Sequence, residues 1–251
     1  MSDRRHTEVL RSEFERVSTS FADRTQGRFD ELKVVEFARL AGGETVVEVG
    51  AGTGNFLQLF GDVAARLIAV DLTPGMLFEA RRRHPEMEQV VADGARLPFG
   101  SRAVELVATA QALHHIWEPL PILKEMRRVM REDGRVLIVD QVSTERYEEA
   151  VVMNQLEIVR DPSHASSRPP SALRTLLRVA GLQIVSERIA EQRERFSNWM
   201  WPGEFPEERI ERVKRFIDEH GPKTRMDFHR DGEDYVFKRR RIMLLAERAT
   251  P

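Results

Sequence analysis

The chain has 251 residues, of which 41% are hydrophobic, and its 39 Lys and Arg against 41 Asp and Glu give a formal net charge of −2. This length accommodates one α/β domain with additions around a single core. The nearly balanced charge argues against general binding to nucleic acid or to an anionic membrane surface. The absence of cysteine excludes disulfides, thiolate nucleophiles and cysteine-ligated zinc, and fits a reducing compartment.

The first residues, MSDRRHTEVLRSEFERV, are charged throughout and contain no apolar run of signal-peptide length. No later stretch approaches ~18 consecutive apolar residues. We therefore expect a cytoplasmic protein.

Two apolar repeats of helical spacing lie near the N-terminus, over residues 9–17 and 32–40, and Gly42-Gly43 ends the second. These helices precede the sheet.

From Thr45 the chain alternates short β-rich runs with helical stretches. Strands are predicted over 45–50, 66–71, 88–93, 104–110 and 135–140, and helices over 53–61, 74–83 and 118–131. The sequence REDGR ends the last of these helices. Such alternation predicts a parallel sheet covered by helices on both faces, with a ligand crevice at the carboxyl ends of its strands.

The remaining third begins with a mostly helical segment that reaches about Arg160. A helix over 171–180, a strand over 182–190 and a final strand over 235–248 are predicted after it. The 191–234 segment between the two strands is polar and aromatic, and a connection of this length usually carries function or a subdomain. The predicted organisation is an N-terminal helical region (1–43), a core (44–190), an insertion (191–234) and a final strand with the C-terminus (235–251).

The glycines of VVEVGAGTGNF have the spacing G-x-G-x-G, whereas a dinucleotide fingerprint has G-x-G-x-x-G. Glu48 lies two residues before the first glycine and would repel a diphosphate, so it favours a ligand with a cationic end. Asp71 ends the second strand, where a carboxylate can accept both hydroxyls of a ribose. Asp93 ends the third strand and can accept from an adenine amine. S-adenosylmethionine combines a cationic group, a ribose and an adenine.

The sequence resembles the class I S-adenosylmethionine-dependent methyltransferases. VVEVGAGTG, AVDLTPGMLFEAR, VADGARLPF, ALHHIWEP and EMRRVMREDGRVLIVD follow the order and spacing of that family's motifs over residues 45–140. The closest resemblance is to the branch with the ubiquinone/menaquinone-biosynthesis C-methyltransferases, and EIVRDPSHASSRPPSALRTLLRVAGL resembles a small-molecule subgroup. The resemblance implies a Rossmann-like three-layer α/β sandwich: a seven-stranded, mostly parallel sheet with an antiparallel last strand, N-terminal helices and a substrate-side insertion.

The resemblance also implies a set of cofactor-binding residues. These are Glu48, Gly50, Ala51, Gly52, Gly54, Asp71, Leu72, Asp93, Gly94, Ala110 and Gln111. Glu48 departs from the family, in which many members have Asp at this position. In this family the loop that here contains Phe21, Arg24 and Phe29 folds over the cofactor as a lid. Methyl transfer needs positioning and desolvation, and it requires no metal.

Histidines are the candidate catalytic bases. His114 and His115 follow the fourth strand, and we prefer His115; alternatively, both only shape a loop beneath the cofactor. His164 lies in RDPSH, where we expect it exposed on a turn with Asp161 capping or pairing with Arg160. A structural corner between two helices is the alternative for this motif.

The predicted acceptor-binding residues are Phe21, Arg160, His164, Trp199 and Trp201. The two tryptophans belong to an aromatic cluster that favours an aromatic or apolar acceptor, although packing of the insertion onto the sheet explains them equally. The basic run KRRR, residues 238–241, is interpreted as a solvated sheet edge and not as a nucleic-acid site.

The sequence thus predicts a methyltransferase that moves a methyl group from S-adenosylmethionine to a small molecule by in-line displacement. The expected protein is a monomer or homodimer that binds no metal, nucleic acid or membrane. Three alternatives stay open. One is a non-catalytic or regulatory protein that binds S-adenosylmethionine, and another is an NAD-dependent oxidoreductase, which the glycine spacing and Glu48 disfavour. The third is a methyltransferase for RNA or protein; the family's amino-methylating members on nucleic acid commonly carry an Asn/Asp-Pro-Pro-aromatic motif after the fourth strand, and AQALHH is not one.

Overall fold

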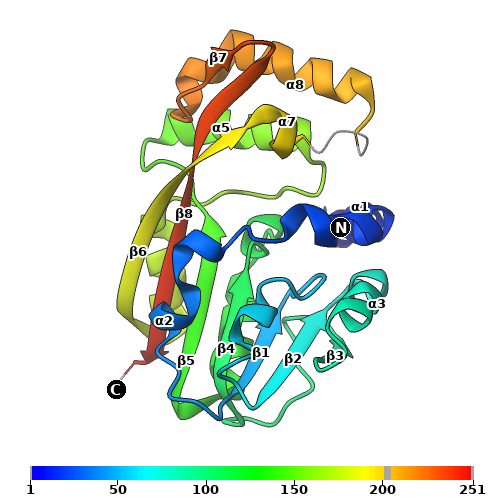
Figure 1. Cartoon of the computed structure of the whole chain (residues 1–251). Helices are drawn as coiled ribbons and strands as arrows, with labels where there is room; N and C mark the ends of the chain where they lie inside the picture. The colour runs from blue at the N-terminus through cyan, green and yellow to red at the C-terminus, as the bar shows by residue number, and fades with distance from the viewer. Residues whose placement is uncertain (1, 201–204, 250–251) are drawn as a thin grey trace.

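The structure of the chain is a computed structural model that describes residues 2–200 and 205–249, and Trp201 lies outside this part. A sheet of eight strands runs through the described residues (Figure 1). Its strands are β1 (Thr45–Val49), β2 (Arg66–Asp71), β3 (Glu88–Val91), β4 (Val104–Ala110), β5 (Met130–Gln141), β6 (Leu182–Arg195), β7 (His229–Asp231) and β8 (Asp234–Arg248). The strand order is β3-β2-β1-β4-β5-β8-β6, and β7 pairs with β8.

The pairing confirms the predicted mixed sheet. β1 is parallel to β2 and β4, β2 is parallel to β3, and β4 is parallel to β5. β8 runs antiparallel to both of its neighbours, β5 and β6. The short β7 adds an eighth strand to the seven that were predicted. The reversal of strand order beside β1 opens a crevice at the carboxyl ends of β1 and β4.

Helices lie on both faces of the sheet. They are α1 (Ser2–Thr25), α2 (Val34–Ala38), α3 (Pro74–Arg83), α4 (Leu120–Val129), α5 (Tyr147–Arg160), α6 (Pro170–Val179), α7 (Phe196–Trp199) and α8 (Glu207–His220), with 3-10 turns η1 (Asp30–Leu32), η2 (Leu57–Phe60), η3 (Leu113–His115) and η4 (Gly221–Thr224). Among the described helices, none combines the length and the apolar character needed to cross a bilayer.

The sheet separates two apolar cores. On one face, Leu123 and Met126 of α4 and Leu177 of α6 pack against the strands. On the other face, Phe37 of α2 and Phe60 of η2 do so. Burying each large apolar side chain contributes roughly 1.5–3 kcal/mol to stability. The two cores therefore hold the sheet, and with it the strand ends that form the crevice.

Two local predictions are wrong. The helix expected over 53–61 is only the 3-10 turn η2, because Gly52 and Gly54 have positive φ and hold the preceding residues in a loop. The sequence REDGR was expected to end a helix before a strand that begins at Arg135. Instead β5 begins at Met130, where it pairs with Val104 of β4 across a register shift.

A smaller cap stands above the sheet and contains much of the 191–234 segment (Figure 1). We define the cap as α5, α7, α8 and η4 with the adjoining ends of β6 and β8, which enclose a third apolar core around Phe196, Trp199 and Phe237. β6 and β8 remain paired along their length, from the pair of Leu182 with Arg248 to the pair of Arg195 with Val236, with one register shift. The cap is therefore built on two strands of the sheet.

Candidate functional site

The loop after β1 lets the backbone come close to a ligand and to its own neighbours. Gly50 has φ +74°, and a Cβ atom there would lie 2.7 Å from the Cβ of Ala112. Gly54 has φ +81°, and a Cβ atom there would lie 3.0 Å from the Sδ of Met87. At both positions the positive φ favours glycine, and a side chain would crowd the neighbouring atom.

The Asp71 carboxylate at the end of β2 holds this loop in place. Its Oδ2 accepts a hydrogen bond from the backbone N–H of Gly52 at 2.8 Å, and its Oδ1 accepts one from the N–H of Thr73 at 2.8 Å. Burial raises the pKa of Asp71, and these backbone N–H groups partly offset that rise. Each carboxylate oxygen keeps acceptor capacity for a ligand hydroxyl.

Glu48 lies below the loop and is only 1% exposed. Its Oε2 has no hydrogen-bond partner among the described residues. Burial, and then the nearby charge of Asp71, raise the pKa of Glu48 well above its ordinary value. A buried carboxylate without a partner is costly, and a cationic or hydrogen-bond-donating ligand group would satisfy it.

These side chains line a first cavity of about 300 Å³. Of the residues predicted to hold a cofactor it brings together Glu48, Gly50, Ala51, Gly52, Asp71, Leu72, Asp93, Gly94, Ala110 and Gln111. Gly54 is the exception, since it packs behind the lining. Asp93 is exposed at the far end, where its Oδ1 accepts from the N–H of Ala95 at 2.9 Å.

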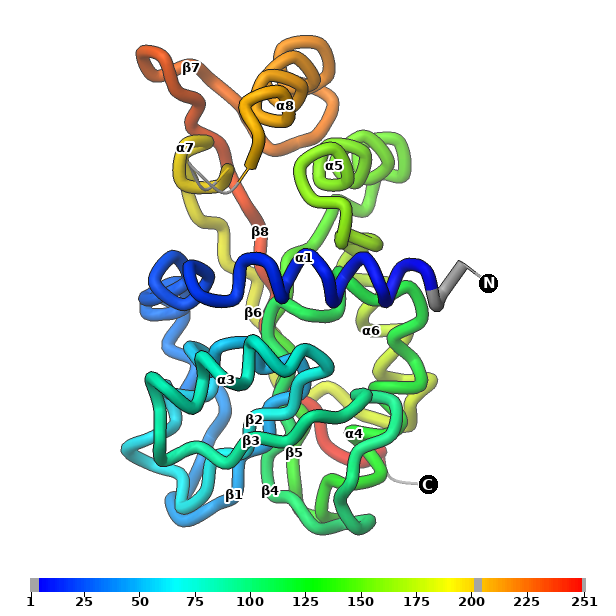
Figure 2. Tube along the Cα trace, turned by 90° about the vertical axis from the view of Figure 1, so that its right-hand side faces the viewer, coloured from blue at the N-terminus to red at the C-terminus, as the bar shows by residue number. Residues whose placement is uncertain are grey.

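Helix α1 crosses above the carboxyl ends of the strands, between α3 and the cap (Figure 2). Phe21 and Phe29, from the predicted lid, both line the first cavity. Asn55 of the glycine loop donates to the carbonyl oxygen of Ala22 at 2.6 Å and to Oγ1 of Thr25 at 2.8 Å. The N-terminal region is thus tied to the cofactor loop.

A second cavity, of about 760 Å³, lies between the first cavity and the cap. Five residues line both cavities: Phe14, Phe21, Arg28, Gln111 and His115. Gln111 ends β4 with φ +52°, and its Nε2 has no partner among the described residues. The two cavities therefore meet at Gln111 and His115.

His115 is fixed by contacts on two sides. Its Nδ1 lies 2.9 Å from the carbonyl oxygen of Ser163 and 3.1 Å from the Oγ of Ser163. A carbonyl only accepts, so Nδ1 carries the proton and Nε2 of the neutral ring is an acceptor. The ring of Phe14 meets the imidazole edge to face at 5.1 Å.

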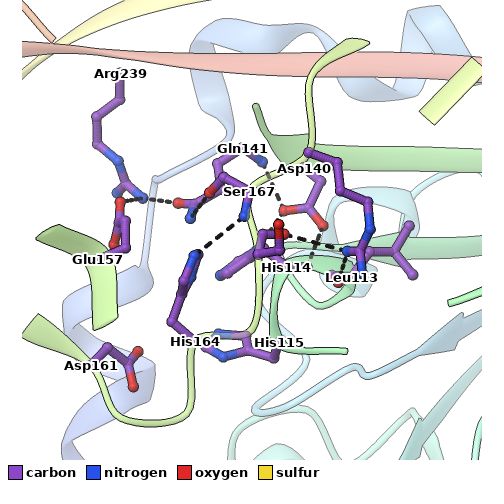
Figure 3. Close-up of polar contacts among 12 residues, drawn as sticks. Leu113, His114, His115, Asp140, Gln141, Glu157, Asp161, His164, Ser167 and Arg239 are labelled. Carbon is purple, nitrogen blue, oxygen red and sulfur yellow. Dashed lines mark hydrogen bonds and ion pairs between the residues drawn. The ribbon is translucent and has the colours of Figure 1, made fainter. Parts of the chain in front are cut away.

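His114 belongs to the buried polar cluster shown in Figure 3, and its ring centroid lies 4.1 Å from that of His115. Its Nδ1 lies 2.6 Å from Oδ1 of Asp140, and its backbone N–H donates to Oδ2 of Asp140 at 3.1 Å. Burial and the neighbouring histidines lower the pKa of His114 well below its ordinary value, while burial raises the pKa of Asp140 to about 6. This pair anchors η3 to the end of β5.

The RDPSH turn was predicted to expose Ser163 and His164, and this is wrong. His164 is 2% exposed and lies outside the lining of both cavities, with its Nε2 2.9 Å from Oδ1 of Asn154. Burial lowers the pKa of His164 to about 4. Asp161 explains the buried turn, because its Oδ1 accepts from the N–H and Oγ of Ser163 at 2.9 and 2.6 Å.

Arg160 and Trp199 do reach the second cavity. The Arg160 guanidinium lies 4.8 Å from the Trp199 ring centroid and forms ion pairs with Glu157 at 3.0 Å and Asp161 at 3.7 Å. The Asp161 contact matches the pairing expected from the sequence. Trp199 also packs in the cap core. It therefore lines a cavity, as the acceptor-binding interpretation requires, and takes part in packing of the insertion, as the alternative requires.

The interpretation of residues 238–241 as a solvated sheet edge is wrong. β8 lies between β5 and β6, and Arg239 and Arg241 are 7% and 3% exposed and line the second cavity. The sequence analysis also missed Arg28 and Phe14. For the two strand arginines a signal existed, since Tyr235, Phe237, Arg239 and Arg241 alternate and therefore share one face of β8.

No group of three or more His, Asp or Glu side chains within residues 2–200 and 205–249 is arranged to hold a metal ion. The polar groups of the site instead match an organic ligand: one buried, one half-buried and one exposed acid along one cavity, and a histidine acceptor where that cavity meets the next.

Comparisons with known proteins agree with this geometry. Residues 47–138 match the family described as a methyltransferase domain. The demethylmenaquinone methyltransferase of Renibacterium salmoninarum is 30% identical over 107 residues, which cover 43% of this chain and 45% of that protein. The chain thus matches less than half of that relative's length. The uncharacterized methyltransferase YcgJ of Bacillus subtilis is 24% identical over 73% of this chain and 74% of its own length.

Solved structures show the same fold. A Bacillus halodurans protein described as a candidate methyltransferase has a TM-score of 0.80 and 26% identity, covering 87% of this chain and 98% of its own. The solved YcgJ structure has a TM-score of 0.77 and 20% identity, covering 87% of this chain and 97% of its own. By its matched domain and its fold, the chain is similar to the class I S-adenosylmethionine-dependent methyltransferases.

Proposed function

We propose that this chain transfers a methyl group from S-adenosylmethionine to a small-molecule acceptor held in the second cavity. The observation that carries the proposal is the junction of the two cavities. A cavity lined by the glycine loop, Glu48 and Asp71 opens at Gln111 and His115 onto a larger one beneath the cap.

The residues of the first cavity fit S-adenosylmethionine. The partnerless Oε2 of Glu48 suits its cationic end, and Gly50 and Gly52 line the cavity with backbone and no side chain. Asp71 would accept from the ribose hydroxyls, and Asp93 from the adenine amine. When bound, S-adenosylmethionine supplies an electrophilic methyl group on a sulfonium centre.

The chain's own residues then position the acceptor and accept its proton. The Ser163 carbonyl holds His115 with Nε2 as the acceptor atom, so His115 can receive a proton from an acceptor in the second cavity. Phe14, Phe21 and α1 cover the junction and exclude water from it. Trp199 offers an apolar surface, which supports an acceptor with an aromatic or otherwise apolar part.

Titration calorimetry with S-adenosylmethionine, S-adenosylhomocysteine and NADH tests the proposal. We expect both adenosyl ligands to bind and NADH not to bind. Asp71→Ala should weaken adenosyl binding by more than about tenfold, because two charge-assisted hydrogen bonds are lost and the loop is released. Asp62→Ala, which changes an exposed Asp, is the matched control. If neither adenosyl ligand binds, or if Asp71→Ala binds as tightly as the wild type, the assignment is wrong.

A further inference from the structure

Seven arginines and five carboxylates line the second cavity. Four of the arginines gather beside one another from three parts of the chain: Arg28 after α1, Arg160 at the end of α5, and Arg239 and Arg241 on β8. Arg28 is half-buried and the other three are buried. Because burying a cation without a counter-charge is costly, the carboxylates around this group decide what the cavity can bind.

Two of the four arginines are neutralised by buried carboxylates. Glu157 lies 3.0 Å from Nη2 of Arg160 and its other oxygen lies 3.8 Å from Nη2 of Arg239, as Figure 3 shows for the second pair. Asp161 adds the 3.7 Å contact to Arg160. Although burial alone would raise it, the arginines lower the pKa of Glu157 to about 2, so Glu157 is charged.

The other two arginines have no ion pair among the described residues. Arg241 donates from Nη1 to the backbone oxygen of Arg28 at 3.0 Å and to the side chain of Gln192, while its Nε has no partner. The guanidinium of Arg28 has neither a hydrogen bond nor an ion pair within the described part of the chain. Burial, then Arg241 and Arg239, lower the pKa of Arg28 to about 9. Glu194 also lines the cavity but forms no ion pair there with a described residue.

We propose that Arg28 and Arg241 form a binding site for an anionic group, a carboxylate or phosphate, carried by the methyl acceptor. Guanidinium groups bind such oxyanions through paired N–H donors, and an anion here would add counter-charge to that of the nearby Glu194, which forms no ion pair with either arginine. The inference rests on the proposed function, since it names a chemical class for the substrate of the same site.

The position of the site defines the shape of that acceptor. Arg28 lines both cavities and so stands near their junction, whereas Arg241 lines only the second. Trp199 provides an apolar surface in the same cavity. The acceptor is therefore a compact molecule with an apolar part, one anionic group and a reactive atom directed at His115.

The carboxylate of S-adenosylmethionine itself is a second source of an oxyanion near Arg28. To separate the two sources, S-adenosylhomocysteine affinity is measured first, by calorimetry, in the wild type and in Arg28→Gln, Arg241→Gln and Arg178→Gln. Arg178 is an exposed arginine of α6 outside both cavities and serves as the matched control. We expect all four proteins to bind S-adenosylhomocysteine within about twofold of one another.

Inorganic phosphate is then titrated into each protein saturated with S-adenosylhomocysteine, with chloride at matched ionic strength as the blank. We expect saturable binding to the wild type and to Arg178→Gln, and at least about tenfold weaker binding to Arg28→Gln and Arg241→Gln. Arg241→Lys keeps the positive charge at this buried position and should retain part of the phosphate binding. Should Arg241→Gln fail to fold, Arg28→Gln alone still decides the result.

The remaining outcomes are distinct. Absent phosphate binding in the wild type, or equal binding in all variants, overturns the anion site. Loss of S-adenosylhomocysteine binding in Arg28→Gln with phosphate binding intact assigns Arg28 to the cofactor carboxylate and overturns its role toward the acceptor. If the wild type binds no adenosyl ligand but binds phosphate in a way that depends on both arginines, the anion site is supported and the methyltransferase function is rejected.

Discussion

The Nδ1 of His115 lies 2.9 Å from the carbonyl oxygen of Ser163, which is 48 residues further along the chain. This contact fixes Nδ1 as the protonated nitrogen and leaves Nε2 to accept a proton in the cavity. We expect His115→Ala to lower kcat by about 10²–10⁴, the range typical of a lost general base. Ser163→Ala keeps the carbonyl and should retain most of the turnover. Near-normal turnover of His115→Ala would leave positioning alone as the source of catalysis.

Glu48 couples ligand binding to a proton. In the free protein, burial and Asp71 raise its pKa, and a cationic ligand beside it lowers that pKa again because it favours the carboxylate. Binding of S-adenosylmethionine should therefore release protons and tighten as the pH rises through the raised pKa. Calorimetry in two buffers of different ionisation enthalpy measures the release. Glu48→Gln should bind more weakly and release fewer protons; equal release from both proteins would show that another group titrates.

The first glycine of the loop should tolerate no side chain. Gly50→Ala forces a residue with φ +74° to carry a Cβ atom 2.7 Å from the Cβ of Ala112. Strain and overpacking together should lower the free energy of unfolding by about 1–3 kcal/mol and weaken adenosyl-ligand binding. Gly100→Ala is the control, since a Cβ atom there meets nothing within 4 Å. Urea unfolding and calorimetry of both variants check this, and matching values for the two variants would refute it.

His164 should make stability depend on pH. Burial lowers its pKa from the ordinary value of 6.5 to about 4, so between these two pH values His164 is protonated in the unfolded chain and neutral in the folded protein. The stabilisation is present above pH 6.5 and is lost as the pH falls toward 4. Between pH 7 and pH 5 the wild type should lose about 2 kcal/mol more unfolding free energy than His164→Gln. Urea unfolding at both pH values measures the difference, with His229→Gln, at an exposed position, as the control.

The cofactor side was predictable because its chemistry follows from chain order. Glu48, Asp71 and Asp93 end or nearly end three consecutive strands, and parallel strands bring their carboxyl ends to one edge. The pattern therefore placed these acids in one crevice without knowledge of side-chain packing. The precise partners did not follow from it: the hydrogen bond from Gly52 to Asp71 depends on the conformation of the loop.

The second cavity and the buried turn beside it were less predictable because they are assembled from distant segments. The burial of His164 depends on Asn154 of α5, and that of Arg239 depends on β8 being inserted between β5 and β6. Asn154 is not adjacent in sequence to His164, and neither β5 nor β6 is adjacent in sequence to β8. The charges of 238–241 favoured a solvated edge, whereas strand alternation with Tyr235 and Phe237 correctly indicates a shared buried face. Here periodicity was a better guide than composition.

The continuous pairing of β6 and β8 from the sheet into the cap has a consequence for access to the site. A hinge between core and cap would have to break the hydrogen-bonded ladder that runs from the pair of Leu182 with Arg248 to the pair of Arg195 with Val236. The wall of the second cavity that β6 and β8 form is therefore stiff. Helix α1 has no such ladder. It is held by the packing of buried residues such as Ala22 and by side-chain contacts, such as that of Glu15 with the N–H of Gly75 at 3.2 Å and that of Asp23 with Arg83 at 2.7 Å. Because α1 lines both cavities without being part of that ladder, we expect product and fresh ligand to exchange on its side of the site.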